Sequence, residues 1–549
     1  MDFINDSEQL LLNMPKTLNT YLGQKGYTIL KNELNIEQQY LIRKELTVKP
    51  FTPGQNIGIK DAANISFPAY RESSAKMYVP RYFGESLFGP AKVSKISEGV
   101  DISLKFNGAI RPNQELAINA YLAHIINSGG GLLDLPCGAG KTVNALKIIS
   151  VLQKKTIIIV HKEFLMNQWI ERISQFMPET RVGKIQGQII DIDNKDIVLC
   201  MLQSLSMKDY PAELFESFGL TVIDEVHHIG SEVFSRALFK LVTKYTLGLS
   251  ATMNRKDGTT KIFKMFLGDV VYSAERAKGD GVVVRGIEYI TSDEEFNEVS
   301  YDFRGNPAYS TMISKLCAYN SRTEFILKVI QDMLKEDDKQ QIMVIAHNKC
   351  VLKYMHDAIN HRNIATCGYY VGGMKESALK ESSSKQILIC TYSMASEGLD
   401  VPTLTTLVMV TPKTDIVQTV GRILRAKHST PIVVDIIDSH QPFKNQWAKR
   451  LSFYKKQDYK VVNCDSTKYG KVPIINWKIT YDPSKPKKIK KGYKKDEELE
   501  ETDDDDEHDD EDMCENFDNA CKDLSETLRK KTENKKDFMP GKCLLKIKK

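Results

Sequence analysis

The chain has 549 residues, of which 42% are hydrophobic and 27% charged, and its formal net charge is only +5. This balance predicts a soluble globular protein of two or three domains, and no apolar run approaches the roughly 20 residues that a membrane span needs. The first six residues lack a signal-peptide pattern, and the ten cysteines include no C-x-x-C pair. We therefore expect an intracellular protein with reduced cysteines, no zinc site and no membrane partner.

Residues 1–105 are expected to form a small accessory domain. The segment Gly26–Leu30 has the composition of a strand, and Glu37–Leu46 has the apolar spacing of a helix. The stretch Met77–Gly84 mixes aromatic residues with an arginine. Such a stretch suits either a surface for bases and phosphates or the core of a small β-rich domain.

A helix is predicted between Ala109 and Gly130, and Arg111 and Gln114 stand near its start. Both residues come shortly before a glycine-bearing loop, which makes them candidates for nucleotide binding. A glutamine amide matches the N6 and N7 atoms of adenine. An ordinary solvated residue is the simpler interpretation of a glutamine at a helix start.

The glycine-bearing loop follows an apolar strand at Gly131–Leu135 and precedes a helix at Thr142–Leu152. Strand, glycine turn and helix in this order offer an anion free backbone N–H groups and a positive helix end. One position departs from the strict G-x-x-x-x-G-K-[ST] pattern, because Leu135 stands where that pattern has glycine. The candidate residues for binding ATP, with Lys141 reaching the β- and γ-phosphates and the Thr142 hydroxyl on Mg²⁺, are Leu135, Pro136, Cys137, Gly138, Ala139, Gly140, Lys141 and Thr142.

Four apolar segments downstream are predicted to be buried parallel strands of a doubly wound α/β sheet, in which function lies at the carboxyl ends of strands. These segments are Thr156–Val160, Asp196–Met201, Leu220–Ile223 and Tyr245–Leu249.

The third of these strands ends at Asp224 and Glu225. Two neighbouring carboxylates are costly to bury without a partner. We expect Asp224 to bind Mg²⁺ through water and Glu225 to orient or deprotonate the attacking water. A salt-bridged strand end is the structural alternative.

A second α/β unit is expected to begin near Val283, with strands at Gln341–Ala346, Gln386–Cys390 and Thr406–Val410, and with Ile432–Ile437 closing the sheet. A helix predicted at Asp415–Ala426 would place three side chains on one face at positions i, i+4 and i+7, namely Gln418, Arg422 and Arg425. Two arginines aimed the same way suggest an anion opposite them, such as the γ-phosphate of ATP. A phosphate-tracking or solvated face is the alternative.

Residues 481–549 are expected to form a charged, largely disordered tail. The tail contains a lysine-rich stretch at Lys485–Lys495 and an acidic block at Asp496–Asp512. Without the acidic block the rest of the chain is basic, as is typical of a nucleic-acid-binding protein. A solvated segment is the simpler interpretation of the tail. A DNA-mimicking segment or a site for a partner such as the transcription machinery is the alternative.

Five motifs in order resemble those of superfamily 2 helicases, in which the first glycine of motif I is often absent. The matching stretches, for motifs I, II, III, V and VI, are Leu135–Thr142, Asp224–His227, Ser250–Thr252, Ser396–Asp400 and Gln418–Arg425. Within that superfamily the chain is similar to the group of the xeroderma-pigmentosum B-type and poxvirus transcript-release DNA helicases. Its N-terminal residues 25–50 resemble those of the large-DNA-virus members.

The resemblance implies two RecA-like lobes, at 106–280 and 281–480, with ATP and Mg²⁺ in the cleft between them. It implies an ATP-dependent helicase or translocase on single- or double-stranded DNA in viral transcription or repair, located in the host cytoplasm or virion, with the nucleus left open. An RNA helicase and a duplex-DNA translocase without strand separation are the alternatives. The residues that it assigns to coupling ATP hydrolysis to movement are His227, Ser250, Ala251, Thr252, Gly398 and Asp400.

Overall fold

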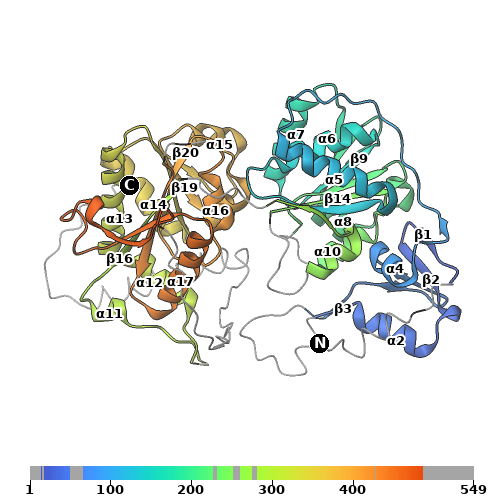
Figure 1. Cartoon of the computed structure of the whole chain (residues 1–549), viewed down its shortest axis with the longest axis horizontal. Helices are drawn as coiled ribbons and strands as arrows, with labels where there is room; N and C mark the ends of the chain where they lie inside the picture. The colour runs from blue at the N-terminus through green and yellow to red at the C-terminus, as the bar shows by residue number, and fades with distance from the viewer. Residues whose placement is uncertain are drawn as a thin grey trace, which may run out of the picture. The chain divides into compact units, whose positions relative to one another are not determined.

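The computed structural model describes residues 14, 18–49, 66–226, 231–251, 260–274, 281–303, 305–426, 428 and 430–485. These residues divide into two compact units, one holding the described residues up to 274 and the other those from 281 onward. Both units are built on a mostly parallel sheet (Figure 1), which confirms the expected α/β class with two parallel-sheet lobes. The acidic block and most of the lysine-rich stretch of the expected tail lie outside the described residues.

The first lobe contains an eight-stranded sheet in the order β11-β10-β12-β9-β13-β14-β8-β15, and only the β10–β11 pair is antiparallel. Its strands are β8 (Gly130–Asp134), β9 (Thr156–Val160), β10 (Val182–Gln186), β11 (Ile189–Asp191), β12 (Ile197–Met201), β13 (Leu220–Ile223), β14 (Tyr245–Ser250) and β15 (Val270–Ser273). The helices are α5 (Pro112–Ser128), α6 (Lys141–Leu152), α7 (Glu163–Phe176), α8 (Leu202–Met207), α9 (Ser231–Leu238) and α10 (Thr260–Leu267).

Each face of this sheet buries its own apolar layer, because successive strand residues point to opposite sides. On β9, Ile158 and Val160 belong to a core shared with α5, α6 and α7. The alternate residues Ile157 and Ile159 belong to a second core, which α8, α9 and α10 complete. Helices therefore cover both faces of the sheet, and the ends of the strands are left for function.

The N-terminal residues form a five-stranded sheet in the order β5-β6-β2-β1-β7, which packs against the first lobe. Its elements are β1 (Tyr21–Gly23), β2 (Gly26–Leu30), α2 (Ile36–Glu45), β5 (Arg71–Glu72), β6 (Lys76–Val79), α4 (Arg81–Phe88) and β7 (Val93–Ser94), with a separate short pair β3 (Thr47–Val48) and β4 (Phe67–Pro68).

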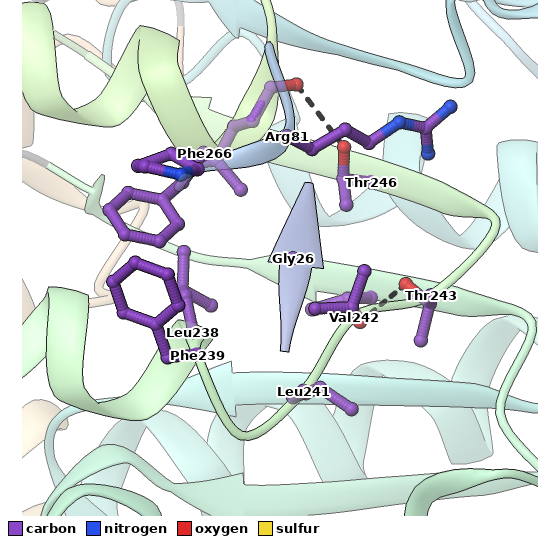
Figure 2. A pocket seen from close by; sticks show the side chains of 12 residues that line it. Gly26, Arg81, Leu238, Phe239, Leu241, Val242, Thr243, Thr246 and Phe266 are labelled. Atoms are coloured by element: carbon purple, nitrogen blue, oxygen red, sulfur yellow. Dashed lines mark hydrogen bonds between the residues drawn. The ribbon is translucent and has the colours of Figure 1, made fainter. Parts of the chain in front are cut away.

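The stretch 77–84 forms part of this packing. Met77, Val79 and Phe83 are buried, and Arg81 donates to the carbonyls of Lys244 (2.9 Å) and Ser128 (3.2 Å) in the first lobe. The cavity that lies beside Arg81 (Figure 2) encloses only about 20 Å³, which is room for about one water molecule. The core interpretation of this stretch therefore fits the contacts that these residues make.

The second lobe contains another eight-stranded sheet, in the order β18-β19-β17-β20-β21-β16-β22-β23. Its strands are β16 (Val283–Tyr289), β17 (Gln341–Ala346), β18 (Cys367–Tyr370), β19 (Ile387–Thr391), β20 (Leu404–Met409), β21 (Ile432–Asp438), β22 (Lys460–Asp465) and β23 (Lys478–Tyr481). The helices are α11 (Glu294–Asn297), α12 (Tyr309–Ala318), α13 (Asn320–Glu336), α14 (Lys349–His361), α15 (Glu376–Ser383), α16 (Val417–Arg422) and α17 (Gln441–Lys456), together with the π-helical turn η4 (Met394–Gly398).

Two expectations about this lobe are wrong. The strand at 432–438 does not close the sheet, because β16, β22 and β23 lie beyond it. The helix expected at 415–426 spans only Val417–Arg422, so Arg425 does not share a helical face with Gln418. The N–H of Ile423 bonds to the carbonyls of Gly421 and Val420, and these tighter bonds end the helix.

Candidate functional site

Three of the predicted motifs in the first lobe come directly after neighbouring strands. Strand β14 pairs with β13 on one side and with β8 on the other. Because all three strands are parallel, their carboxyl ends meet at one edge of the sheet. This edge brings together the loop after β8, the acids after β13 and Ser250 at the end of β14.

The loop after β8 has an anion-binding conformation. Gly138 and Gly140 have positive φ angles of 83° and 81°, which glycine adopts without strain. The N-cap residue of α6 is Gly140, which has no side chain that could accept from the first N–H groups of the helix. A side-chain carbon on Gly138 would meet no atom of the described residues within 4 Å, so the loop is open on that side with respect to them. This cradle and the uncapped helix end fit a phosphate group.

Leu135 explains why the loop tolerates a residue other than glycine at its start. Its side chain is 2% exposed and belongs to the core under α5, α6 and α7. Its N–H bonds to the carbonyl of Ser250 at 2.8 Å. The φ angle of Leu135 is not positive, so this position does not require glycine. The loop residues Pro136, Cys137 and Ala139 are half-buried.

Lys141 lies next to both carboxylates of the second motif. Its Nζ is 2.5 Å from Oε1 of Glu225, and both side chains are largely buried. Burial lowers the pKa of Lys141, but the neighbouring carboxylates, Glu225 above all and Asp224 after it, outweigh burial and raise the pKa overall. The lysine is therefore held in its charged form at neutral pH.

Asp224 is 6% exposed. Its Oδ2 accepts from Trp169 Nε1 (2.9 Å), and its Oδ1 accepts from the N–H of Glu225 (3.0 Å). Burial raises the pKa of this carboxyl, and the neighbouring Glu225 raises it further, against the opposing effect of Lys141. Its ionised form is therefore costly even with the Lys141 ammonium nearby, and a further cation at this carboxylate would stabilise it.

Glu225 has a φ angle of +49°, a region that a residue with a side chain rarely adopts. Strained backbone of this kind persists where the surrounding structure holds it, and it is common in active sites. Here the Lys141 ammonium and the Asp224 carboxylate hold the residue from two sides.

No group of three or more metal-ligating side chains occurs among the residues that the structure describes. A magnesium ion bound with ATP needs only one or two protein ligands, because phosphates and water complete its coordination. Asp224 and Thr142, the second residue of α6, supply the oxygen donors that such an ion prefers.

Gln114 ties α5 to the loop. Its side chain is 4% exposed; Oε1 accepts from the N–H of Arg111 (3.0 Å), and Nε2 donates to the carbonyl of Ala139 (3.3 Å). The side-chain amide of Gln114 is therefore hydrogen-bonded to the backbone at Arg111 and at Ala139. One N–H of its nitrogen and one lone pair of its oxygen remain for a nucleotide base. Arg111 itself is exposed.

In the second lobe, the segments after β19 and β20 are joined by arginines. Arg422 is 5% exposed, and its guanidinium donates to the carbonyls of Leu399 (3.1 Å) and Ser396. Arg425 forms an ion pair with Asp400. Tyr370 donates to the carbonyl of Gly398 at 3.3 Å. The two arginines therefore link α16 and the residues just after it to the segment 396–400, and Tyr370 links β18 to η4. Gln418 lies half-buried on α16.

Two predicted coupling residues, His227 and Thr252, lie outside the described residues. Ser250 is fully buried and Ala251 is half-buried at the end of β14.

Several residues with evident roles were not singled out in the sequence. Trp169 is one, since nothing in the local sequence around a tryptophan indicates that its indole N–H donates to an acid 55 residues further along the chain. Arg322 and Arg450 are two others, and both are fully buried. Arg322 forms an ion pair with Asp438 and Arg450 forms one with Asp435, both on β21. Aspartates inside an otherwise apolar strand were the available signal.

No helix in the described ranges is long and apolar enough to span a membrane.

Two family models match this chain. The model described as Type III restriction enzyme, res subunit, matches residues 107–255, and the model described as Helicase conserved C-terminal domain matches residues 325–427.

The chain is 35% identical over 460 residues to a protein of Acanthamoeba polyphaga mimivirus named ATP-dependent RNA helicase L396, a match that covers 82% of this chain and 87% of that protein. It is 27% identical over 396 residues to the African swine fever virus protein named ATP-dependent RNA helicase QP509L, covering 67% and 77%. It is 26% identical over 404 residues to the DNA 3'-5' translocase XPB2 of Sulfurisphaera tokodaii, covering 65% and 88%.

Proposed function

The chain belongs to the superfamily 2 helicases and is therefore a nucleic-acid-dependent ATPase, and we propose that it uses ATP hydrolysis to move along DNA. The observation that carries this proposal is the cluster at the end of β8 and β13. There the Lys141 ammonium, the carboxylates of Asp224 and Glu225, and an uncapped helix end gather beside a glycine loop.

In this proposal the loop from Leu135 to Thr142 binds the phosphates of ATP. Lys141 leaves Glu225 to pair with the β- and γ-phosphates, and Glu225 is then released to orient or deprotonate the attacking water. A magnesium ion held by Asp224 and the Thr142 hydroxyl would neutralise developing charge on the phosphates. The unfavourable charge of buried Asp224 supports this assignment, because a cation relieves it.

The second lobe would supply the arginine that stabilises the transferred phosphoryl group. Arg425 is the better candidate, because its side chain is 21% exposed. The guanidinium of Arg422 is instead occupied by the carbonyls of Leu399 and Ser396. To reach a phosphate, Arg425 must break its ion pair with Asp400 and bind the nucleotide instead. The loss of that ion pair would couple nucleotide binding to the segment around Gly398.

Coupling to movement results if the γ-phosphate favours closure of the two lobes and hydrolysis favours opening. We assign this coupling to His227, Ser250, Ala251 and Thr252 in the first lobe and to Gly398 and Asp400 in the second. Contacts to phosphates carry no base sequence, so such a motor is sequence-tolerant and salt-sensitive.

DNA is the proposed track, and a subgroup with the xeroderma-pigmentosum B-type helicases is the proposed placement. The similarity to a protein named as a DNA translocase supports both. RNA is the second candidate, because two viral relatives carry the name of RNA helicases.

The test measures ATP hydrolysis by the full chain with single-stranded DNA, duplex DNA and RNA of equal length, next to strand displacement with 3′ and 5′ overhangs. We expect stimulation by DNA to exceed that by RNA, and we expect displacement from one overhang only. Stimulation by RNA alone would replace DNA with RNA as the track. Stimulation by duplex DNA without any displacement would identify a duplex translocase.

A further inference from the structure

Four consecutive backbone carbonyls, from Val410 to Lys413, each accept a hydrogen bond from a different side chain. This 410–413 segment connects the end of β20 to the loop that leads into α16. The donors and distances are Arg322 to Val410 (2.7 Å), Tyr392 to Thr411 (2.5 Å), Tyr309 to Pro412 (2.8 Å) and Arg450 to Lys413 (3.0 Å).

The four donors come from separate parts of the second lobe. Arg322 belongs to α13, Tyr392 comes directly after β19, Tyr309 begins α12 and Arg450 belongs to α17. A loop usually leaves its carbonyls to water. Here the position of each carbonyl is fixed from a different direction, so the segment cannot shift without breaking bonds to several elements.

The two arginines are themselves fixed. Arg322 makes a bidentate pair with Asp438, with N···O distances of 2.6 and 2.8 Å. Arg450 makes a bidentate pair with Asp435, with both distances 2.8 Å. All four side chains are 0–1% exposed. Buried pairs of this kind add little net stability but impose a specific geometry, and both aspartates lie on β21, the neighbour of β20.

The side chain of Thr411 adds a further contact to the same segment. Its hydroxyl accepts from the N–H of His347 (3.1 Å) and lies 2.9 Å from Nδ1 of the same residue. His347 comes directly after β17, which lies between β19 and β20 in the sheet. The segment is therefore tied to the ends of three neighbouring strands.

The 410–413 segment leads into the arginine-bearing part of the lobe. Asp415 accepts from the N–H of Val417, the first residue of α16, and Arg422 and Arg425 come at the end of that helix and just after it. An arginine that stabilises a transition state must be held within a fraction of an ångström, and misplacement by about 1 Å can cost on the order of 100-fold in rate.

We infer that Tyr309, Tyr392, Arg322 and Arg450 are positioning residues for ATP hydrolysis, which act by holding the 410–413 segment and through it Arg425. This inference rests on the proposed role of Arg425. None of the four residues lies in the motifs that define the site, and their contribution is to the geometry of the arginine rather than to contact with ATP.

The test removes the two tyrosine hydroxyls, because these changes keep the aromatic rings and the buried arginine pairs intact. We expect Tyr309→Phe with Tyr392→Phe to lower kcat of nucleic-acid-stimulated ATP hydrolysis about tenfold or more. The KM for ATP should stay within about twofold, because the arginine acts mainly in the transition state.

Tyr481→Phe is the matched control. Its hydroxyl also donates one part-buried hydrogen bond, to Asp458 at 2.7 Å, but it lies on β23 far from the segment in the strand order. The control should keep the kcat of the unaltered chain. A double variant that matches this control in kcat would overturn the inference, as would losses of kcat and of melting temperature that are equal in the double variant and in the control.

A second comparison separates this inference from the proposed function. In an Arg425→Ala background the two tyrosine changes should cause no further loss of kcat, because their effect passes through the arginine. If Arg425→Ala itself leaves turnover unchanged, the proposed function fails. If it abolishes turnover while the tyrosine variants remain fully active, only the positioning role fails.

Discussion

Buried charged groups are partnered differently in the first lobe and in the second lobe. At the end of β13, Asp224 is buried with a raised pKa, and Glu225 has a left-handed backbone. In the second lobe, Arg322 and Arg450 each have a bidentate carboxylate partner inside the protein. The first site keeps a buried acid whose ionised form is costly, whereas the second lobe holds Arg322 and Arg450 each in a bidentate pair with a buried carboxylate.

This difference fits a division of labour. A site that must change partners during a reaction benefits from groups whose present interactions are replaceable, such as the pair of Lys141 with Glu225. A site that must present one arginine accurately benefits from a rigid frame. In the second lobe the rigid frame consists of the buried ion pairs of Arg322 and Arg450. The ion pair between Arg425 and Asp400 is partly exposed and is the interaction that can be exchanged.

The largest expected effect comes from removing the replaceable charges of the first lobe. Lys141→Ala or Glu225→Gln should reduce stimulated ATP hydrolysis to background, because the first removes the phosphate contact and the second removes the base. Lys147→Ala, further along the chain on α6, is the control and should hydrolyse ATP normally. Normal turnover in either site variant, measured by phosphate release, would break the assignment of this site.

The next largest effect distinguishes the two arginines near the end of α16. Arg425→Ala should lower kcat about 10³-fold or more while ATP still binds. Arg422→Ala should instead lower the melting temperature, since the carbonyls of Leu399 and Ser396 lose their donor. Equilibrium nucleotide binding and thermal unfolding of both variants measure the two outcomes. Equal loss of nucleotide affinity in Arg425→Ala would indicate a structural role.

A stability comparison tests the frame itself. Arg322→Ala should cost about 3–5 kcal/mol in free energy of unfolding, because it leaves Asp438 buried without its partner. Arg362→Ala removes an arginine whose pair with Glu324 is 41% exposed on both sides, and it should cost less than about 1 kcal/mol. Urea unfolding measures both. Equal costs would show that the buried pair does not hold the second lobe together.

The smallest effect concerns the cost of the buried Asp224 charge. Because the folded pKa of Asp224 is raised, its contribution to stability is favourable below the unfolded pKa of about 3.9 and is lost as pH rises through the folded value. Asp224→Asn should therefore be inactive but should melt higher than the unaltered chain at neutral pH. Its advantage should shrink as pH falls. A variant that melts lower at neutral pH would contradict the pKa direction.

The sequence predicted most of the first lobe because local signals and tertiary structure agree there. The apolar runs at 156–160 and 220–223 are strands with those bounds, since buried parallel strands leave little choice of conformation. The glycine loop was equally evident. The left-handed backbone of Glu225 could not be predicted from the sequence. It depends on a contact with Lys141, which is distant in the chain, and on a hydrogen bond to the side chain of Asp224, which sequence patterns do not indicate.

The second lobe was harder to predict. A helical spacing of Gln418, Arg422 and Arg425 suggested one face, but α16 ends at Arg422 and the chain turns. The order of strands also departs from the chain order, because β16, the first strand of this lobe, lies between β21 and β22. Periodicity describes single elements, whereas strand insertion and helix ends depend on packing partners.

The most direct test of the proposed role of Arg425 in ATP hydrolysis is the affinity of ADP–aluminium fluoride, which mimics the phosphoryl group during its transfer. We predict that Arg425→Ala weakens this complex at least about 100-fold and leaves ADP affinity unchanged, whereas Lys141→Ala weakens both. Unchanged affinity of Arg425→Ala for ADP–aluminium fluoride would contradict the proposed role of Arg425 in stabilising the transferred phosphoryl group.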